Sequence, residues 1–334
     1  MKNIITAWIT TNYTCNCKCD WCYARKMLGK HQNIDLQYAM KIVEYLKKTG
    51  VETITLIGGE PTIYPNLIDL ISFIRSLGIK VRIATNGKRF KEKEYTKKIL
   101  DIGIDGINIS IKGLNEEEYF YYTHQYGFND MIEGYNNLCK FGFDPSVSYV
   151  ITDSNVEKFE SFVHLLLTEK MDNLIIHFEK PSLSLTSNSK TMNIKEMGTF
   201  TAYIYSTLEE TGINYTIEAS FPLCLIPEHT LNEMLIKKKI STCCHVQKGN
   251  GIVFGVTGEI IPCNHFLGFP IENEPLNLQN ENAIEELMAT DEYKKFKNVV
   301  HRYPTEKCTT CNLWRICGGG CFTRWFYLNP KDYI

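Results

Sequence analysis

The fold is decided by the stretch Cys15-Asn16-Cys17-Lys18-Cys19-Asp20-Trp21-Cys22, which gathers several thiols in one short loop. Within it, Cys15, Cys19 and Cys22 form the pattern C-x3-C-x2-C. Thiolates at this spacing can converge on one side of an iron–sulfur cluster, and three thiolates leave one of the four irons of a cubane open for chemistry. A structural zinc loop is the alternative. We interpret Cys17 as a small buried hydrophobic residue rather than a further ligand.

The composition is that of an ordinary globular protein, with 44% hydrophobic and 22% charged residues in 334. The net charge of -2 gives no electrostatic basis for nucleic-acid binding. No apolar run reaches the length of a membrane span, and the N-terminus has no signal-peptide pattern. Thirteen cysteines without an export signal indicate metal or redox chemistry in a reducing cytoplasm, rather than a disulfide framework.

Strand-like segments alternate with amphipathic helix-like segments six times between Ile4 and Thr211. This alternation is typical of parallel strands joined by right-handed crossovers. An open doubly wound sheet and a barrel both fit it, and in barrels the chemistry lies at the carboxyl ends of the strands. The expected strands are residues 4–10, 52–57, 79–85, 106–111, 145–152 and 174–179.

Unusual residues fall where these strands end. Gly58-Gly59-Glu60-Pro61 follows the second strand, where glycines let the backbone approach a ligand and a carboxylate can complement an ammonium group. A plain turn is the alternative for this segment. Asn86 follows the third strand, where an Asn-Gly turn is equally expected, and Ser110 lies at the end of the fourth.

These motifs closely resemble the signature of radical S-adenosylmethionine (SAM) enzymes, in which an aromatic residue, here Trp21, precedes the last cysteine. The resemblance implies an α/β fold with a partial (β/α)6 barrel, and a [4Fe-4S] cluster held by Cys15, Cys19 and Cys22 that binds SAM. Lys112 departs from the Asp common at its position and has no assigned role. The residues that the resemblance places around SAM are Trp21, Gly58, Gly59, Glu60, Pro61, Asn86 and Ser110.

Cysteines return after about residue 212, where the regular alternation stops. Residues 252–256 and 259–262 flank Thr257-Gly258 and predict a β-hairpin. One interpretation of the cysteines around and after this hairpin is a pair of zinc knuckles. The cysteines are Cys243 and Cys244, Cys263, and the series Cys308, Cys311, Cys317 and Cys321.

This second series resembles the SPASM domain, the C-terminal auxiliary-cluster domain of many radical SAM enzymes, except that its last cysteine is absent after Cys321. We therefore predict a core domain at 1–212, a SPASM domain at 213–334, and two auxiliary [4Fe-4S] clusters. The resemblance assigns Cys263 and Cys321 to the first, with one or two of Cys224, Cys243 and Cys244. It assigns Cys308, Cys311 and Cys317 to the second.

The fourth ligand of the second auxiliary cluster is open in the sequence. Asp332, His301, water or substrate are the candidates, and we expect a ligand other than cysteine or an open site. A non-thiolate ligand would change the charge of the cluster and therefore its potential. A single auxiliary cluster held by Cys244, Cys263, Cys308 and Cys311 is the alternative.

The resemblance implies reductive cleavage of SAM to a 5′-deoxyadenosyl radical that takes hydrogen from a substrate. Because SPASM enzymes mostly act on peptides, we expect a peptide-modifying enzyme that crosslinks, epimerises or oxidises a residue during RiPP maturation. Asn264 stands where formylglycine-forming relatives carry Asp, which disfavours that reaction. The alternatives are a radical SAM enzyme acting on a sugar or amino acid, and a non-catalytic metal-binding protein. No catalytic residue is assigned.

The expected partners are a peptide substrate and an electron donor such as flavodoxin or ferredoxin. We expect binding neither to nucleic acid nor to a membrane. Fourteen residues precede Cys15, so we expect no N-terminal leader-binding domain. The peptide would then bind in the barrel directly or through a separate leader-recognition protein. The bond changed, the fate of SAM and the oligomeric state stay open.

Overall fold

A computed structural model describes residues 4–30, 32–181, 192–242, 244–272 and 274–334. Its strands are β1 Thr6–Thr10, β2 Thr53–Ile57, β3 Lys80–Thr85, β4 Gly106–Ile111, β5 Ser146–Ile151, β6 Leu174–Phe178, β7 Tyr215–Glu218, β8 Ile240–Ser241, β9 Gly251–Phe254 and β10 Ile260–Ile261. Its α-helices are α1 Leu36–Lys48, α2 Leu67–Ser76, α3 Lys93–Ile102, α4 Glu116–Thr123, α5 Phe128–Lys140, α6 Phe159–Thr168, α7 Ile194–Glu209, α8 Glu228–Ile236, α9 His245–Lys248, α10 Ala283–Ala289, α11 Asp291–Val300 and α12 Trp314–Cys317. None of the helices in these ranges is both long enough and apolar enough to cross a bilayer.

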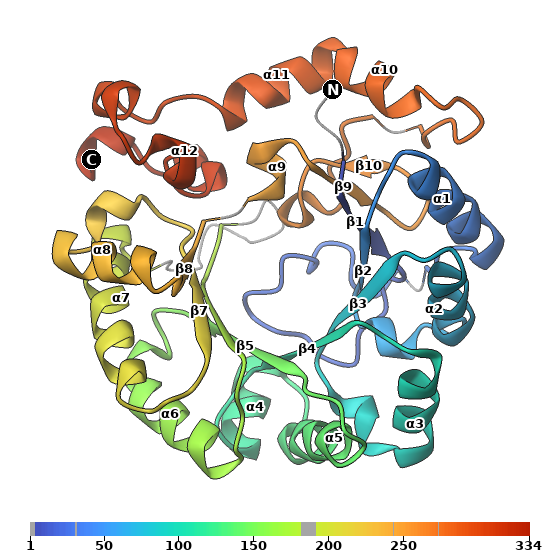
Figure 1. Ribbon diagram of the computed structural model, residues 1–334, viewed down its shortest axis with the longest axis horizontal. Helices are drawn as coiled ribbons and strands as arrows, with labels where there is room; N and C mark the ends of the chain where they lie inside the picture. The colour runs from blue at the N-terminus through green and yellow to red at the C-terminus, as the bar shows by residue number, and fades with distance from the viewer. Residues whose placement is uncertain (1–3, 31, 182–191, 243, 273) are drawn as a thin grey trace.

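The strands form one sheet in the order β10-β9-β1-β2-β3-β4-β5-β6-β7-β8. Neighbours from β1 to β8 pair in parallel. Figure 1 shows this sheet curved around a central space, with α1 to α7 on the outside. Because β10 and β8 are the two ends of the order, the barrel is open in the described part of the chain. The predicted α/β fold with a partial barrel is confirmed.

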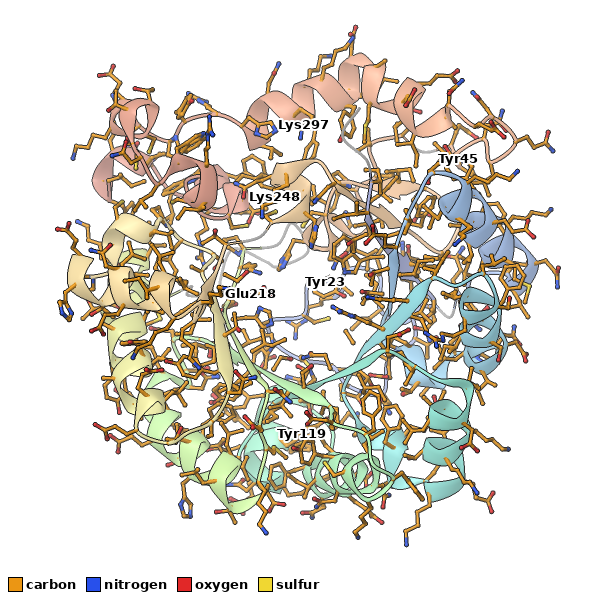
Figure 2. The ribbon with its side chains drawn as sticks, in the orientation of Figure 1. Tyr23, Tyr45, Tyr119, Glu218, Lys248 and Lys297 are labelled. Carbon is orange, nitrogen blue, oxygen red and sulfur yellow. The ribbon has the colours of Figure 1, made fainter. Side chains whose placement is uncertain are left out.

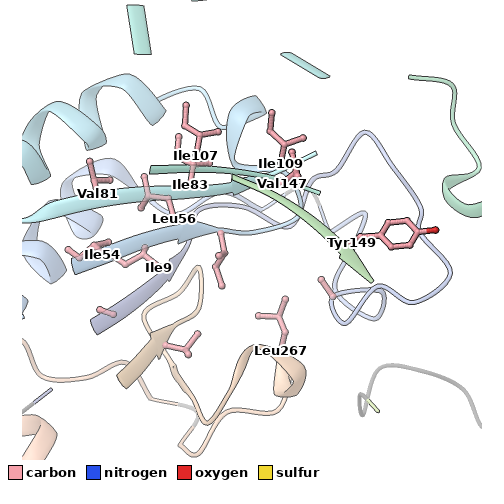
Figure 3. Close-up of a cluster of buried hydrophobic side chains, with 14 of the residues drawn as sticks. Ile9, Ile54, Leu56, Val81, Ile83, Ile107, Ile109, Val147, Tyr149 and Leu267 are labelled. Carbon is pink, nitrogen blue, oxygen red and sulfur yellow. The ribbon is translucent and has the colours of Figure 1, made fainter. Parts of the chain in front are cut away.

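The core lies between the outer face of the sheet and the helices. Along β4, Ile107, Ile109 and Ile111 are buried, whereas the residues between them are partly exposed to the central space. Period-two alternation of this kind separates the two faces of a strand. Figure 3 shows the apolar side chains of β1 to β5, including Ile9, Leu56, Ile83, Ile109 and Val147, gathered in one cluster. The helix-facing positions therefore stabilise the barrel and leave the lumen-facing positions available for a site.

The sheet continues beyond the predicted boundary at residue 212, which falls between α7 and β7. β7 and β8 extend it at one edge. At the other edge β9 pairs in parallel with β1, a long-range return that the sequence analysis did not predict. The predicted hairpin is present, because β10 pairs antiparallel with β9. The division into two domains stays a prediction.

Arg324 joins the C-terminal segment to the barrel. It lies in the 3-10 helix Phe322–Phe326, and only 1% of it is exposed. Its Nε donates to the Ser220 carbonyl oxygen at 2.7 Å, and its Nη2 donates to the Glu179 carbonyl oxygen at 2.6 Å. Burial lowers the pKa of Arg324 to about 10, while Cys321 and Glu179 raise it, so the guanidinium stays charged at neutral pH. A charged donor thus ties the ends of β6 and β7 to the last segment of the chain.

We expect Arg324→Leu to lower the free energy of unfolding by about 2–4 kcal/mol, because buried carbonyl groups would lose a charged donor. Urea unfolding of the apo-protein, followed by circular dichroism, measures the change. The exposed Arg302→Leu is the matched control and should unfold near the wild-type midpoint. Equal midpoints for the two variants would contradict this role of Arg324.

Candidate functional site

A cavity of about 280 Å³ opens at the carboxyl ends of the first six strands. The alternation described above places polar residues of β4 and β5 in its wall, and the loop after β1 supplies thiols. Figure 2 shows Tyr23 of that loop near the centre of the ring of strands. The lining residues are Cys15, Cys17, Cys19, Trp21, Cys22, Tyr23, Ile57, Gly58, Gly59, Glu60, Ala84, Thr85, Asn86, Asn108, Ser110, Lys112, Ser148, Val150 and His177.

Except for Pro61, every residue that the sequence analysis placed around the first cluster and SAM lines this cavity. Pro61 is buried at the start of a short 3-10 helix next to it. A larger cavity of about 690 Å³ lies between the end of α1 and helices α10 and α11, and cysteine is not among its lining residues. The chemistry of the lining therefore selects the barrel cavity as the candidate site.

The cysteine loop is held by the segment around α4. The backbone N–H of Lys18 donates to the Thr123 carbonyl oxygen at 2.8 Å, and that of Asp20 to the Tyr122 carbonyl oxygen at 3.1 Å. Cys17 is 2% exposed, and its Sγ lies 3.4 Å from Tyr119 Oη. This burial agrees with the interpretation of Cys17 as a small core residue, although its sulfur also reaches the cavity.

Gly58 and Gly59 lie against residues 12–15, which follow β1 and begin the cysteine loop. The Gly59 N–H donates to the Asn12 carbonyl oxygen at 2.8 Å, and the Glu60 N–H donates to the Thr14 carbonyl oxygen at 2.8 Å. A Cβ atom on Gly59 would lie 2.2 Å from the Thr14 carbonyl oxygen. Glycine is therefore required here by the close approach of two backbones, whatever ligand the cavity holds.

The Glu60 carboxylate is 2% exposed and is surrounded by protein donors. Its Oε1 accepts from the Thr62 N–H at 3.0 Å, the Thr62 hydroxyl at 2.7 Å and the Thr85 hydroxyl at 2.6 Å, and its Oε2 accepts from the Asn86 N–H at 2.8 Å. Burial raises the pKa of Glu60, and these hydrogen bonds oppose the rise. The carboxylate thus joins the loops after β2 and β3. Its expected pairing with a SAM ammonium group stays a prediction.

We expect Glu60→Gln to lower the free energy of unfolding by about 1–3 kcal/mol, because the new amide would face a buried N–H with no acceptor. Urea unfolding of the apo-protein measures this change. Glu52→Gln makes the same chemical change at an exposed position and should be close to neutral. If the two variants lost stability equally, the buried carboxylate would not hold these loops.

Asn86 and Lys112 bring further polar groups to the cavity. Asn86 Nδ2 donates to Asn16 Oδ1 at 2.6 Å, which attaches the loop after β3 to the cysteine loop. Gly87 after it has a φ of 80°, so the expected Asn-Gly turn is also present. Lys112 Nζ donates to Ser110 Oγ at 3.0 Å. Burial opposes the charge on Lys112, but the thiols of the cysteine loop raise its pKa. The sequence assigned no role to this cation, which lines the same cavity as the thiols.

A second cavity of about 110 Å³ lies under the C-terminal segment and is lined by Cys244, Cys263, Cys317 and Cys321. Glu218 and Lys180 also line it. Glu218 Oε2 lies 3.0 Å from Nδ1 of His177, which lines the first cavity, so this contact stands between the two cavities. Burial raises the pKa of Glu218, but His177 and Lys180 lower it to about 2. Figure 2 shows Glu218 beside the centre of the ring.

The described C-terminal cysteines all carry free thiols, and Cys243 lies outside the described residues. Within the described ranges, no three His, Cys, Asp or Glu side chains converge tightly enough to hold a single metal ion. Cys244, Cys263, Cys317 and Cys321 instead lie around the second cavity. A multi-iron cluster meets its cysteine ligands at wider spacing than one zinc ion does, because the irons and sulfides lie between them. The chemistry of the donor set therefore fits iron–sulfur clusters.

Comparison with known proteins shows what the chain is similar to. Residues 9–166 match the radical SAM superfamily. "Probable GTP 3′,8-cyclase" of Saccharolobus islandicus is 27% identical over 159 residues, covering 47% of this chain and 51% of that protein. Fe-coproporphyrin III synthase of Methanosarcina barkeri is 25% identical over 177 residues, covering 53% and 44%. The chain thus matches about half the length of these curated relatives.

Solved structures match over nearly the whole chain. SuiB of Streptococcus suis bound to S-adenosylmethionine has a TM-score of 0.76 at 18% identity, covering 99% of this chain and 76% of SuiB. SuiB has also been solved bound to its precursor peptide SuiA, with a TM-score of 0.76 at 19% identity, covering 99% and 74%. anSMEcpe with bound AdoMet has a TM-score of 0.74 at 16% identity, covering 98% and 92%. At these identities the matches show a shared fold.

Proposed function

The chain belongs to the radical SAM superfamily through residues 9–166, and from that premise we propose that it is an enzyme that modifies a peptide. The superfamily uses a [4Fe-4S] cluster and SAM. When bound, they supply reductive cleavage of SAM to a 5′-deoxyadenosyl radical, which abstracts hydrogen from the substrate. The observation that carries the proposal is the barrel cavity, whose wall contains the loop thiols, Gly58-Gly59-Glu60 and Ser110.

In this proposal the protein positions its cofactors and protects them from water. Cys15, Cys19 and Cys22 hold the cluster, and Gly58 and Gly59 allow SAM to approach the backbone. Lys112, anchored on Ser110, balances the negative charge of the thiolates. The remaining SAM contacts that we propose are Trp21, Glu60, Pro61, Asn86 and Ser110.

We also propose auxiliary clusters in residues 213–334. The second cavity gathers Cys244, Cys263 and Cys321 beside Lys180, whose pKa these thiols and Glu218 raise against the effect of burial. A cationic group next to several thiolates suits a negatively charged cluster. An auxiliary cluster at this place can accept the electron left on a substrate radical, or bind the substrate.

The peptide substrate is supported by fold similarity, since SuiB has been solved with a precursor peptide and anSMEcpe with a peptide and AdoMet. A small-molecule substrate is the second candidate, because the curated relatives are named for a GTP cyclase and a coproporphyrin synthase. Those relatives match only part of this chain. The near-complete structural coverage therefore favours the peptide.

The test is a substrate assay with the reconstituted protein, SAM and dithionite under anaerobic conditions. Short peptides encoded beside the gene are added, and mass spectrometry follows both the peptide and 5′-deoxyadenosine. We expect a mass change in one peptide and transfer of deuterium from the labelled peptide to 5′-deoxyadenosine, with neither for the Cys19→Ala control. Deuterium transfer from a sugar or amino acid, with every peptide unchanged, would favour the second candidate instead.

A further inference from the structure

We propose that Cys224 is the fourth thiolate of a C-terminal iron–sulfur cluster whose other ligands are Cys308, Cys311 and Cys317. The inference rests on the proposal that the C-terminal cysteines hold clusters. It replaces our expectation of a non-cysteine ligand, because the earlier segment that carries Cys224 packs against Cys317.

The segment that carries Cys224 packs against the later cysteines. Cys224 lies in the 3-10 helix Leu223–Leu225, which follows β7. The Leu223 N–H donates to Cys317 Sγ at 3.4 Å, and the Cys321 N–H donates to the Ser220 carbonyl oxygen at 3.1 Å. A Cβ atom on Gly320 would lie 2.7 Å from the Phe221 backbone, so the two segments are in direct contact.

Backbone contacts divide the cysteines into two groups. In the first, the Cys311 N–H donates to the Cys308 carbonyl oxygen at 3.4 Å, and the Trp314 N–H donates to the Cys311 carbonyl oxygen at 3.0 Å. Trp314 begins α12, which ends at Cys317, and the Leu223 N–H joins the residue before Cys224 to Cys317 Sγ.

The second group faces the smaller cavity. Cys244, Cys263 and Cys321 line this cavity together with Lys180, whereas Cys224, Cys308 and Cys311 are not among its lining residues. Cys317 also lines this cavity and lies between the two groups, but its contact with Leu223 N–H places it beside Cys224. We therefore move Cys224 in this proposal from the first auxiliary cluster, for which the sequence offered it as a candidate, to the second.

Four thiolates would complete the ligation of this cluster and leave no iron open to substrate. A fully cysteine-ligated cluster is suited to electron transfer. Two of the thiols, those of Cys224 and Cys311, belong to exposed residues, whereas Cys308 is buried. The cluster would thus lie near the surface, where an external electron donor or acceptor can approach it.

The experiment counts cluster iron without any SAM assay. The full chain is reconstituted anaerobically on a background in which Cys15, Cys19 and Cys22 are all replaced by Ala, so that only C-terminal clusters contribute. Iron, acid-labile sulfide and zinc are measured per chain, with electron paramagnetic resonance of the oxidised and reduced protein. We expect Cys224→Ala to lose between roughly one and four irons per chain and to change the spectrum.

The matched control is Cys139→Ala, which removes an exposed thiol on α5. It should keep all the iron, as should Asp332→Asn at the carboxylate that the sequence offered as a ligand. The double variant Cys224→Ala/Cys308→Ala should lose no more than one cluster, whereas Cys224→Ala/Cys263→Ala should lose iron from two. Non-additivity of this kind identifies residues that act in one unit.

Two outcomes would overturn the inference: equal iron, sulfide and spectra for Cys224→Ala and Cys139→Ala, or zinc bound in place of iron at these thiols. Circular dichroism of each apo-variant distinguishes loss of a ligand from failure to fold. Failure of the inference would leave the proposed peptide modification intact, because that proposal depends on the N-terminal cluster. Conversely, a chain that cleaves no SAM could still lose iron as expected here.

Discussion

Replacing Cys15, Cys19 or Cys22 with Ala should reduce the formation of 5′-deoxyadenosine to the background of the iron-free protein. Each removes one of the three thiolates proposed to hold the cluster that binds SAM, and all three line the barrel cavity. Each variant should also lose roughly four irons per chain. Anaerobic reconstitution, iron analysis and chromatography of the SAM products measure both effects.

Cys17→Ala is the matched control, because it removes a thiol from the same loop. It should keep the cluster and its activity, with a modest loss of stability from the buried contact of Cys17 with Tyr119. Substantial activity in Cys15→Ala, Cys19→Ala or Cys22→Ala would defeat the ligand assignment. Loss of cluster iron in Cys17→Ala would show that its sulfur, which also reaches the cavity, is a ligand.

Gly59→Ala should produce the second large effect, a fall of about 100-fold in SAM cleavage, without touching a cysteine. The added Cβ atom would lie 2.2 Å from the Thr14 carbonyl oxygen and 3.1 Å from the Cys15 backbone nitrogen. Because both contacts are with backbone, the start of the cysteine loop must move. A displacement of about 1 Å at reacting groups can cost about 100-fold in rate.

Gly106→Ala at the start of β4 is the control for this substitution. Its Cβ atom would meet Arg82 Cγ at 3.1 Å, which is part of a side chain that can shift. Its rate of SAM cleavage should stay close to that of the wild type. Equal rates for Gly59→Ala and wild type would show that the contact between Gly59 and Thr14 does not position the loop.

The sequence predicts the first half of the fold well, because period-two strands and amphipathic helices alternate regularly there. It misses α4, whose apolar residues Tyr119 to Tyr122 are consecutive and form no helical stripe. It also misses β7 and β8, which have only four and two residues. The pairing of β9 with β1 joins segments far apart in the chain, so no local pattern can reveal it.

The same difference between local patterns and long-range packing separates the predicted from the unpredicted residues of the candidate site. The residues that line the barrel cavity stand in compact motifs at strand ends, where a short pattern is enough to find them. Only the folded chain brings Glu218 and Lys180 to the second cavity and Cys224 to its neighbourhood. The sequence offered Cys224 as a candidate ligand of the first auxiliary cluster, but its neighbours depend on how the 3-10 helix after β7 packs against Cys317. Lys112 was visible as a departure from its motif, and its proximity to the thiols explains that departure in terms of charge.

If the barrel cavity holds a cluster at which SAM is cleaved, the anaerobically reconstituted wild-type protein should convert SAM to 5′-deoxyadenosine and methionine in the presence of dithionite. Quantifying both products in one incubation is the decisive measurement. We expect them to accumulate together in proportion to the bound iron and to be absent without reductant. A protein that carries its full iron and sulfide yet forms no 5′-deoxyadenosine, or one that binds stoichiometric zinc and little iron, would contradict this expectation.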